Sequence, residues 1–583
     1  MTSFSSHDSG DAHGAAGASS PLPGFRPGWY FTLFAGVLVL LVLACFWNKT
    51  GSGTLLFHLK AGDTIQAYSQ VPHHDIFSVG SRPGLWSYVE WFWAVVLNVC
   101  FKLGDWVAVS GLNVALAALV LLTTCVRARM ARAGWLELLV VAWVMMVALL
   151  PGFQPVPVYG ALVVFAVSLV AVEAPRLWPM AILPMLSLLW VNIHPGAVLL
   201  VLVPLALQVL PDKNVPVTSW KRRRAYPIFM VLACLVMLLA NPHSVRIFEA
   251  YGEIARDLME QWRGNMAVLF GTAEGVLRVV ALVAFLLAAV WQRALRRHDV
   301  LVLLVLGGAT VWLWADGVNF LLVYLAPRVA LALTRGLAVS WQTRRVSGLA
   351  ATALCIFGVA WTAVAFQAAR VVPDGLVAVA RSRTMPMGTN PGAGVRAEVF
   401  PEMAAGRLAP VTLRTTILNR PEHGDFLIWR LWPGWKVVVD GREELYSQAF
   451  LENYENVWRG AEGWEEYFAL WQVNAVLGDT ALAEDFPERN LYHVLADSPE
   501  WSAVFWDRGS IVYLRSDIEI SATNLTPFRV LRPGISWEMQ VERIRSDFEW
   551  VELSADLRRA LADDPLNEVA EEFLRRVDER IGR

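Results

Sequence analysis

Long apolar segments recur through the first two thirds of the chain, and this recurrence constrains the fold more than any other feature. A helix needs about 20 apolar residues to cross a hydrocarbon core roughly 30 Å thick. Eleven segments come close to this length, at 29–47, 106–126, 135–151, 158–173, 177–193, 196–210, 226–241, 275–292, 299–315, 318–334 and 347–369. The sequence therefore predicts a polytopic α-helical membrane protein.

The composition supports this class and excludes others. Hydrophobic residues make up 56% of the chain and charged residues 17%, against about 45–50% and about 25% in soluble domains. The net charge of -2 comes without a uniformly basic region, so we expect no nucleic-acid partner. All 5 cysteines lie in apolar runs, which argues against a disulfide-stapled fold.

Basic linkers give the spans a direction. Cytoplasmic loops carry an excess of arginine and lysine, and four linkers are basic, RARMAR (127–132), KRRR (221–224), RALRR (293–297) and RGLAVSWQTRR (335–345). An N-terminus in the cytoplasm satisfies all four and leaves everything after residue 370 outside. The segment at 87–101 would reverse this order if it crossed fully. We therefore expect it to lie in the interface, with a short span as the alternative.

The chain divides by composition into four parts. Residues 1–27 are small and polar and lack the charged start of a signal peptide, so we expect a disordered leader that stays attached. Residues 28–370 form the transmembrane domain. Residues 371–535 contain short strand-like runs between helical stretches, which predicts an extracytoplasmic α/β domain; the runs are VTLRTTIL, GDFLIWRL, WKVVVDG, NAVLGD, WSAVFWD and SIVYLRS. Residues 536–583 are predicted as two amphipathic helices that pack on this domain or on a partner.

The first outer loop carries three candidate carboxylates. Its first part, NKTGSGTLLFHLKAGDTIQAY, has an apolar stripe and a polar side, which predicts a helix lying along the membrane interface. Asp63 lies on this helix, Asp75 in the Pro-bounded loop after it, and Glu90 further on. Carboxylates close to a bilayer are functional candidates by default. The alternatives are that Asp75 caps a local turn and that Glu90 pairs with Lys102 or Arg82.

Histidines and arginines in the outer loops are candidate ligand-binding residues. The side chains that could serve as metal ligands are His58, His73, His74 and Asp75. The adjacent histidines His73 and His74 lie in a loop and lack the i, i+4 spacing that fixes geometry on a helix. We therefore predict no metal site and no cofactor. Arg246 and Arg263 could bind an anionic group such as a lipid phosphate, or could simply extend to the membrane surface.

The order of motifs resembles a family of uncharacterised bacterial inner-membrane proteins that are similar, in their membrane half, to GT-C glycosyltransferases. The resemblance covers roughly residues 29–515 and rests on HLKAGDTIQAYSQVPHHDIFSV, LWSYVEWFW, LLWVNIHPGAVLL, NPHSVRIFEAY, DGVNFLLVYLAP and GDFLIWRLWPGWKVVVDGREELY. It implies a GT-C-like fold with a C-terminal extracytoplasmic α/β domain. It also implies a polyprenyl-phosphate-linked sugar as donor.

The resemblance also implies a mechanism. An aspartate or glutamate after the first span acts as general base on the acceptor hydroxyl, and cationic groups hold the departing phosphate. This chain has no carboxylate between Asn48 and Leu59, so the base has moved to Asp75 or Asp63, or the reaction has been lost. The candidate substrate-binding residues are His58, His74, His194, Asn241, Arg246, Arg263, Asn319, Asp440 and Arg442. Asp440 and Arg442 could instead pair to shape a turn.

Two functions follow as expectations. The first is a glycosyltransferase at the outer face of the bacterial inner membrane, with membrane lipids and the lipid-linked donor as partners. The second is a non-catalytic assembly or scaffold protein that binds a protein partner through its C-terminal domain. A transporter fits less well, because the spans show few ionisable groups and no inverted repeat. A site on one face also requires the α/β domain to pack against the first outer loop.

Overall fold

The computed structural model describes residues 36, 46–47, 49–82, 88–149, 153–174, 178–197, 228–243, 258–295, 297–312, 315–337, 393–396, 399–411, 415–442, 445–480, 490–517 and 525–582. The predicted leader, the predicted span at 347–369, most of those at 29–47 and 196–210, and Arg246 lie outside the described residues.

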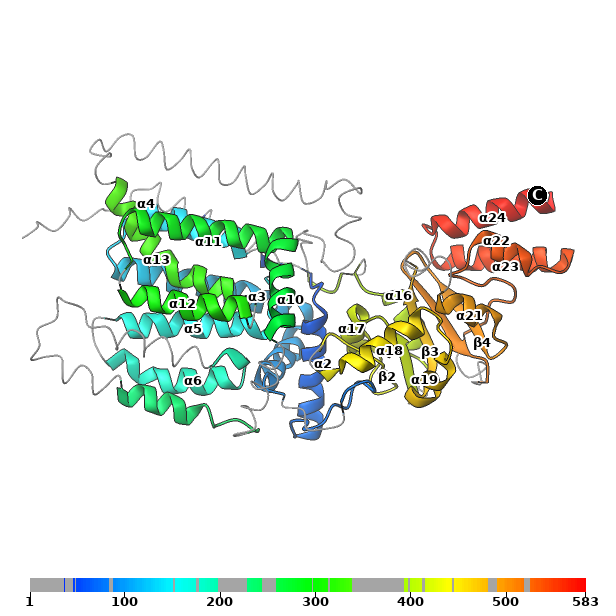
Figure 1. Ribbon diagram of the computed structural model, residues 1–583, viewed down its shortest axis with the longest axis horizontal. Coiled ribbons are helices and arrows are strands. Elements are labelled where there is room, and N and C mark those ends of the chain that lie inside the picture. Colours follow the sequence, from blue (N-terminus) through cyan, green and yellow to red (C-terminus); the bar gives the residue numbers. More distant parts are fainter. Residues whose placement is uncertain are drawn as a thin grey trace, which may run out of the picture.

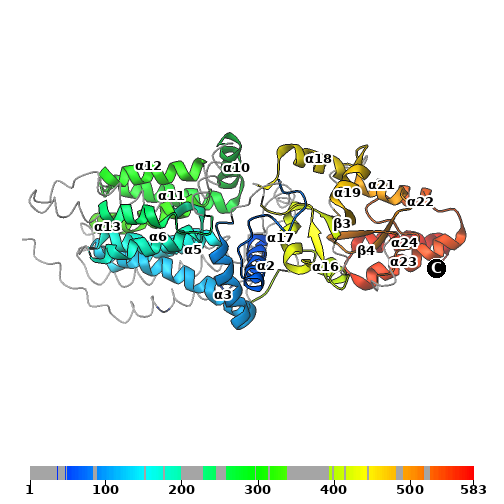
Figure 2. The same cartoon turned by 90° about the horizontal axis from the view of Figure 1, so that it is seen from below.

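The described residues form two parts that lie end to end (Figure 1). A bundle of apolar helices makes up one part, and a sheet with its helices makes up the other. Helix α2 (Gly53–Tyr68) lies between them, and the C-terminus is at the end remote from the bundle in both views (Figure 2). An apolar helical half followed by an α/β domain agrees with the predicted fold class.

Helix α13 (Gly317–Leu337) lies at the centre of the bundle, where it contacts five other helices and where every residue from 317 to 330 is buried. These five are α3 (Trp91–Met130), α4 (Trp135–Leu149), α5 (Pro157–Glu173), α11 (Ala273–Trp291) and α12 (Arg297–Trp312). Outside them lie α6 (Leu183–Val191), α10 (Leu258–Gly271) and the short 3-10 helices Trp178–Ile182 and Pro195–Ala197.

The described helices include membrane-crossing candidates. Two of them, Trp91–Met130 and Gly317–Arg335, are long and apolar enough to cross, and the bent pair Arg263–Gly271 and Gly275–Trp291 would make a third. Shorter apolar helices coincide with other predicted spans, at Glu137–Leu149, Pro157–Glu173, Trp178–Val191, Ile228–Met237 and Asp299–Trp312. These helices support a membrane protein. The count of eleven spans and their direction stay predictions.

Helix α3 joins two segments that the sequence separates. The segment predicted to lie in the interface and the span at 106–126 form one helix, which is broken by a kink at Gly104 and Asp105. Asp105 has φ 52° and ψ -149°, outside the helical region, so the helix changes direction there. The first part of α3 lies against α2, and the second part enters the bundle.

Helix α2 is more deeply buried than an interfacial helix would be. It packs against α3 on one side and against α17 (Pro421–Leu431) on the other. His58, a polar residue of this helix, is 1% exposed. At Gly62 an added Cβ would lie 2.1 Å from the Ala94 carbonyl oxygen, so the crossing of α2 and α3 requires glycine.

The α/β domain contains a five-stranded sheet with the order β2-β1-β3-β5-β4. Strand β1 is parallel to β2 and β3, and β5 is antiparallel to β3 and β4. The strands are β1 (Thr415–Asn419), β2 (Trp435–Val437), β3 (Val473–Asp479), β4 (Trp501–Trp506) and β5 (Ser510–Arg515). Five of the six predicted strand-like runs are therefore confirmed.

The sixth run, GDFLIWRL, is wrong as a strand, because it forms most of α17. Pro421 occupies the first turn of this helix, where a missing backbone N–H costs nothing. The other helices of the domain are α16 (Glu402–Leu408), α18 (Gln448–Trp458), α19 (Trp464–Trp471) and α21 (Leu491–Asp497). Helices α18 and α19 lie between the runs WKVVVDG and NAVLGD, where helical stretches were expected between the strand-like runs.

Three helices follow the sheet where two were predicted, α22 (Trp537–Glu542), α23 (Asp547–Asp563) and α24 (Glu568–Ile581). Helix α23 contacts β4, and Phe573 of α24 packs against Trp506 and Trp537. They therefore pack on the α/β domain, as one of the two alternatives predicted.

Candidate functional site

The first outer loop joins the sheet of the α/β domain. After α2, the segment 76–80 runs parallel to β2. The Val79 N–H donates to the Val437 carbonyl (3.0 Å), and the Val437 N–H donates to the Phe77 carbonyl (3.2 Å). The Gly80 N–H continues the pattern to the Val438 carbonyl (3.1 Å). The loop thus covers the edge of β2, and the expected contact between this loop and the α/β domain is confirmed.

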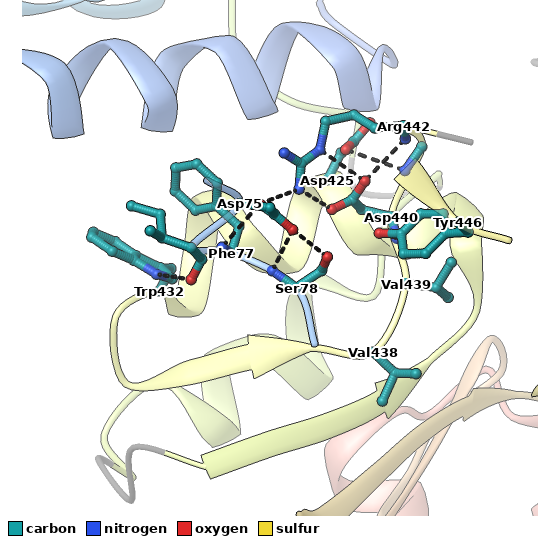
Figure 3. Close-up of polar contacts among 12 residues, drawn as sticks. Asp75, Phe77, Ser78, Asp425, Trp432, Val438, Val439, Asp440, Arg442 and Tyr446 are labelled. Atoms are coloured by element: carbon teal, nitrogen blue, oxygen red, sulfur yellow. Dashed lines mark hydrogen bonds and ion pairs between the residues drawn. The ribbon is translucent and has the colours of Figure 1, made fainter. Parts of the chain in front are cut away.

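Arg442 fixes this junction through two carboxylates (Figure 3). Its Nε lies 3.0 Å from Asp440 Oδ1, and its Nη2 lies 2.9 Å from Asp75 Oδ1. The three side chains are 9%, 0% and 3% exposed, in the order Arg442, Asp440 and Asp75. Burial alone would lower the pKa of Arg442, but Asp440 and then Asp75 raise it well above its usual value. The guanidinium therefore stays charged, 4.5 Å from the Phe57 ring centre.

Asp75 is fully engaged in this junction. Its carboxylate accepts hydrogen bonds from the Phe77 N–H (3.1 Å), the Ser78 N–H (3.2 Å) and the Ser78 hydroxyl, besides the Arg442 contact. An acceptor hydroxyl has little access to a carboxylate so buried and so occupied. The geometry therefore favours the turn-capping alternative for Asp75. The pairing of Asp440 with Arg442 is confirmed.

Asp63 lies apart from this junction. Its carboxylate is 48% exposed and lies 2.9 Å from Lys102 Nζ. Lys102 also donates to Gln66 (2.9 Å). The Lys102 side chain, on α3, therefore contacts Asp63 and Gln66. Among the described residues, these contacts do not include the predicted pair between Glu90 and Lys102.

Glu90 lies at the start of α3 beside a buried histidine. Its Oε2 lies 3.3 Å from His58 Nε2, and the two side chains are 28% and 1% exposed. On the other side of the ring, His58 Nδ1 lies 2.6 Å from the Tyr88 hydroxyl. Of the three carboxylates that the sequence singled out, Glu90 alone combines partial exposure with a buried polar neighbour.

A second loop packs against the start of α3. Trp91 Nε1 donates to Asn192 Oδ1 (2.8 Å), and the Phe92 N–H donates to the Asn192 carbonyl (3.2 Å). His194 follows in this loop and is 8% exposed. Burial lowers the pKa of His194, and the charges of Glu90 and Asp316 oppose the shift. The imidazole is therefore neutral near pH 7 and lies within electrostatic range of Glu90.

The sequence analysis missed one charged residue that contacts Asp316, which is Arg278. Arg278, on α11, lies 3.2 Å from Asp316 and 3.4 Å from the Tyr159 hydroxyl. Asn319 donates to the same Asp316 oxygen (3.3 Å), and its own Oδ1 is buried without a hydrogen-bond partner among the described residues. Arg278 interrupts the apolar run GVLRVVALVAF. An ionisable residue inside such a run is the signal that could have found it.

The remaining predicted site residues are His74, Arg263 and Asn241, and none of the described contacts joins them to Glu90. His74 and Arg263 are exposed. Asn241 bonds locally, since its Oδ1 accepts from the His243 N–H (2.9 Å) and its Nδ2 donates to the Leu238 carbonyl (3.2 Å). Among the described residues, no three histidine, cysteine or acidic side chains lie close enough to hold a metal ion.

The carboxyl ends of β1 and β3, where open α/β sheets often bind ligands, are covered by aromatic side chains. The Tyr454 hydroxyl donates to the Asn419 carbonyl (2.7 Å), and the Tyr492 hydroxyl donates to the Asp479 carbonyl (2.8 Å). At Gly478 an added Cβ would lie 2.2 Å from the Tyr492 hydroxyl. This part of the sheet edge is packed as core.

Comparisons with known proteins give a distant structural neighbour. No protein-family model and no curated protein sequence matches the chain. The crystal structure of the Archaeoglobus fulgidus oligosaccharyltransferase in the apo form aligns with 84% of this chain and 75% of its own, at 12% sequence identity and a TM-score of 0.47. A likeness at this level does not assign a reaction to this chain.

Proposed function

We propose that the chain is a membrane-embedded glycosyltransferase. It transfers a sugar from a polyprenyl-phosphate carrier to an acceptor hydroxyl at the outer face of a bacterial inner membrane. The observation that carries this proposal is the Glu90 carboxylate, which is partly exposed and in contact with the buried His58. Glu90 is the N-cap residue of α3 and contacts His58 of α2, the helix that lies between the apolar bundle and the α/β domain (Figure 1). A carrier held in the membrane and an acceptor from the aqueous side would meet at such a junction.

In this proposal Glu90 is the general base. It takes the proton of the acceptor hydroxyl while the acceptor oxygen bonds to the anomeric carbon, and the bond from that carbon to the phosphate oxygen breaks. The leaving phosphate needs cationic or hydrogen-bonding groups. Arg278, His194 and Asn319 are the candidates among the described residues, because Arg278 and Asn319 contact Asp316 and the charge of Asp316 also acts on His194.

The test is the breakdown of a defined donor. The purified protein in lipid nanodiscs is supplied with undecaprenyl phosphates that carry radiolabelled glucose, mannose or arabinose, and release of label from the lipid is followed with water or added peptides as acceptor. We expect Glu90→Gln to slow release by about a hundredfold or more. Asp63→Asn is the matched control, because it removes an exposed carboxylate from the neighbouring helix. An equal rate for Glu90→Gln and the parent would reject the assignment.

A scaffold protein is the second candidate, and two observations favour it. Asp75 is occupied by Arg442 and its own turn, and the strand ends of the α/β domain are packed with aromatic rings. In that case the C-terminal helices α23 and α24 would bind a protein partner. The parent and all carboxylate variants would then leave the donors intact, and removal of 536–583 would abolish co-purification of the partner.

A further inference from the structure

Helix α2 carries a histidine that is buried without being part of the hydrophobic core. His58 is 1% exposed, and its ring stacks on Tyr88 with the centroids 5.9 Å apart and the planes at 12°. Buried polar groups cost free energy unless they are hydrogen-bonded. Each ring nitrogen has one polar neighbour. The Tyr88 hydroxyl lies 2.6 Å from Nδ1, and Glu90 Oε2 lies 3.3 Å from Nε2.

The two contacts differ in kind. The Nδ1 contact with Tyr88 is short. Within the described part of the chain, the Nε2 atom makes no hydrogen bond of regular geometry, although Glu90 Oε2 is close. Contacts between catalytic groups are often long before substrate binds and tighten in the reactive complex. Because the Glu90 side chain is 28% exposed, it has room for the small rotation that would close this contact.

Tyr88 determines which nitrogen can serve Glu90. Burial raises the pKa of Tyr88 well above its usual value, and the charge of Glu90 raises it further. The hydroxyl therefore keeps its proton and can donate it to Nδ1. A neutral imidazole that accepts at Nδ1 carries its hydrogen on Nε2, where it points toward Glu90.

We propose that His58 is a positioning residue for Glu90: its Nε2–H holds Glu90 Oε2, and the Tyr88 hydroxyl fixes the ring in the orientation that this requires. The inference rests on the proposed function, in which Glu90 is the base. His58 itself contacts neither donor nor acceptor, since its ring is enclosed by Tyr88, Phe57 and Glu90. It therefore acts by orientation and not, as the sequence predicted, by binding substrate.

Two amide variants separate this role from general packing. The amide nitrogen of glutamine can replace the Nε2 of histidine, whereas that of asparagine replaces Nδ1. We therefore expect His58→Gln to retain donor breakdown within about tenfold of the parent. His58→Asn should lose about a hundredfold in kcat with little change in KM, because an unheld base is misaligned but substrate still binds. His493→Gln is the control, because this buried histidine caps α21 far from Glu90.

A thermal-unfolding cycle tests the contact without any substrate. The melting temperatures of the parent, His58→Asn, Glu90→Gln and the double variant are compared. If His58 holds Glu90, the two changes are not additive. Additive shifts overturn the proposal, as do equal losses of kcat in His58→Asn and His58→Gln. If the parent breaks down no donor, or if Glu90→Gln is as active as the parent, the proposed function fails. The unfolding cycle then decides the His58–Glu90 contact by itself.

Discussion

Replacing Arg442 with methionine should release the first outer loop from the α/β domain. The substitution keeps an unbranched apolar side chain but leaves Asp75 and Asp440 side by side, with exposures of 3% and 0%. Removing one partner of a buried ion pair costs about 3–5 kcal/mol. The loss of the guanidinium contact with Phe57, at 4.5 Å, adds to this cost. We therefore expect local opening of the junction to become two to three orders of magnitude more frequent, by roughly 1.4 kcal/mol per factor of ten.

Hydrogen exchange read out by mass spectrometry measures this opening directly. The amides of Val79, Gly80 and Val437 are bonded across the junction, so their exchange reports its opening. Asp75→Asn is the matched control, because it leaves Arg442 paired with Asp440 and should cost only about 1 kcal/mol. The reasoning is refuted if exchange over 76–82 is unchanged in Arg442→Met, or if Asp75→Asn accelerates it equally.

Three further outcomes are expected. Gly62→Val should lower the melting temperature by several degrees or prevent folding, because its Cβ would lie 2.1 Å from the Ala94 carbonyl oxygen; Gly62→Ala should cost less. Arg127→Leu should destabilise the bundle by about 3 kcal/mol, measured by chemical denaturation, because Glu173 loses its partner at 2.9 Å and keeps the weaker contact with Arg328 at 3.8 Å. Stability should fall as the pH drops from about 7 to 5, because the folded protein holds His194 at a lowered pKa while the unfolded chain binds the proton more readily; a His194→Gln variant should show a shallower pH dependence.

Local patterns predicted most of the α/β domain, because strands and helices there follow the spacing of apolar residues. The prediction of a strand at GDFLIWRL was wrong because its apolar residues are consecutive. A consecutive apolar run is found both in buried helices and in buried strands. Helix α2 was predicted correctly as a helix, but its burial by other helices was missed for a different reason. Its apolar stripe indicates that one face is covered, but the same stripe fits a lipid surface and a protein surface. Only the tertiary structure shows that α3 and α17 cover it.

Charged residues were predicted well only where their partners are close in sequence. The pairing of Asp440 with Arg442, two residues apart, was one of two stated alternatives. Arg127 was assigned to a basic cytoplasmic linker, yet it is 1% exposed and donates to the Val323 carbonyl (2.7 Å). The helical donor to that carbonyl would be residue 327, which is a proline. Arg127 supplies the hydrogen bond that Pro327 cannot, and no local pattern contains that information.

Glu90, at the contact between α2 and α3, is a candidate replacement for the catalytic acid that the matching stretch of this chain lacks. The family that the chain resembles carries its base after the first span; the matching stretch here, from Asn48 to Leu59, leads into α2 and contains no carboxylate. A replacement must reach the same helix from elsewhere. Asp75 is turned into the α/β junction, and Asp63 faces Lys102 in the solvent. Glu90 comes from α3 and meets α2 at His58. A base that moved in sequence while staying beside α2 in space would therefore be Glu90; under the proposed function its loss should slow sugar transfer by about a hundredfold or more, where the loss of Asp63 does not.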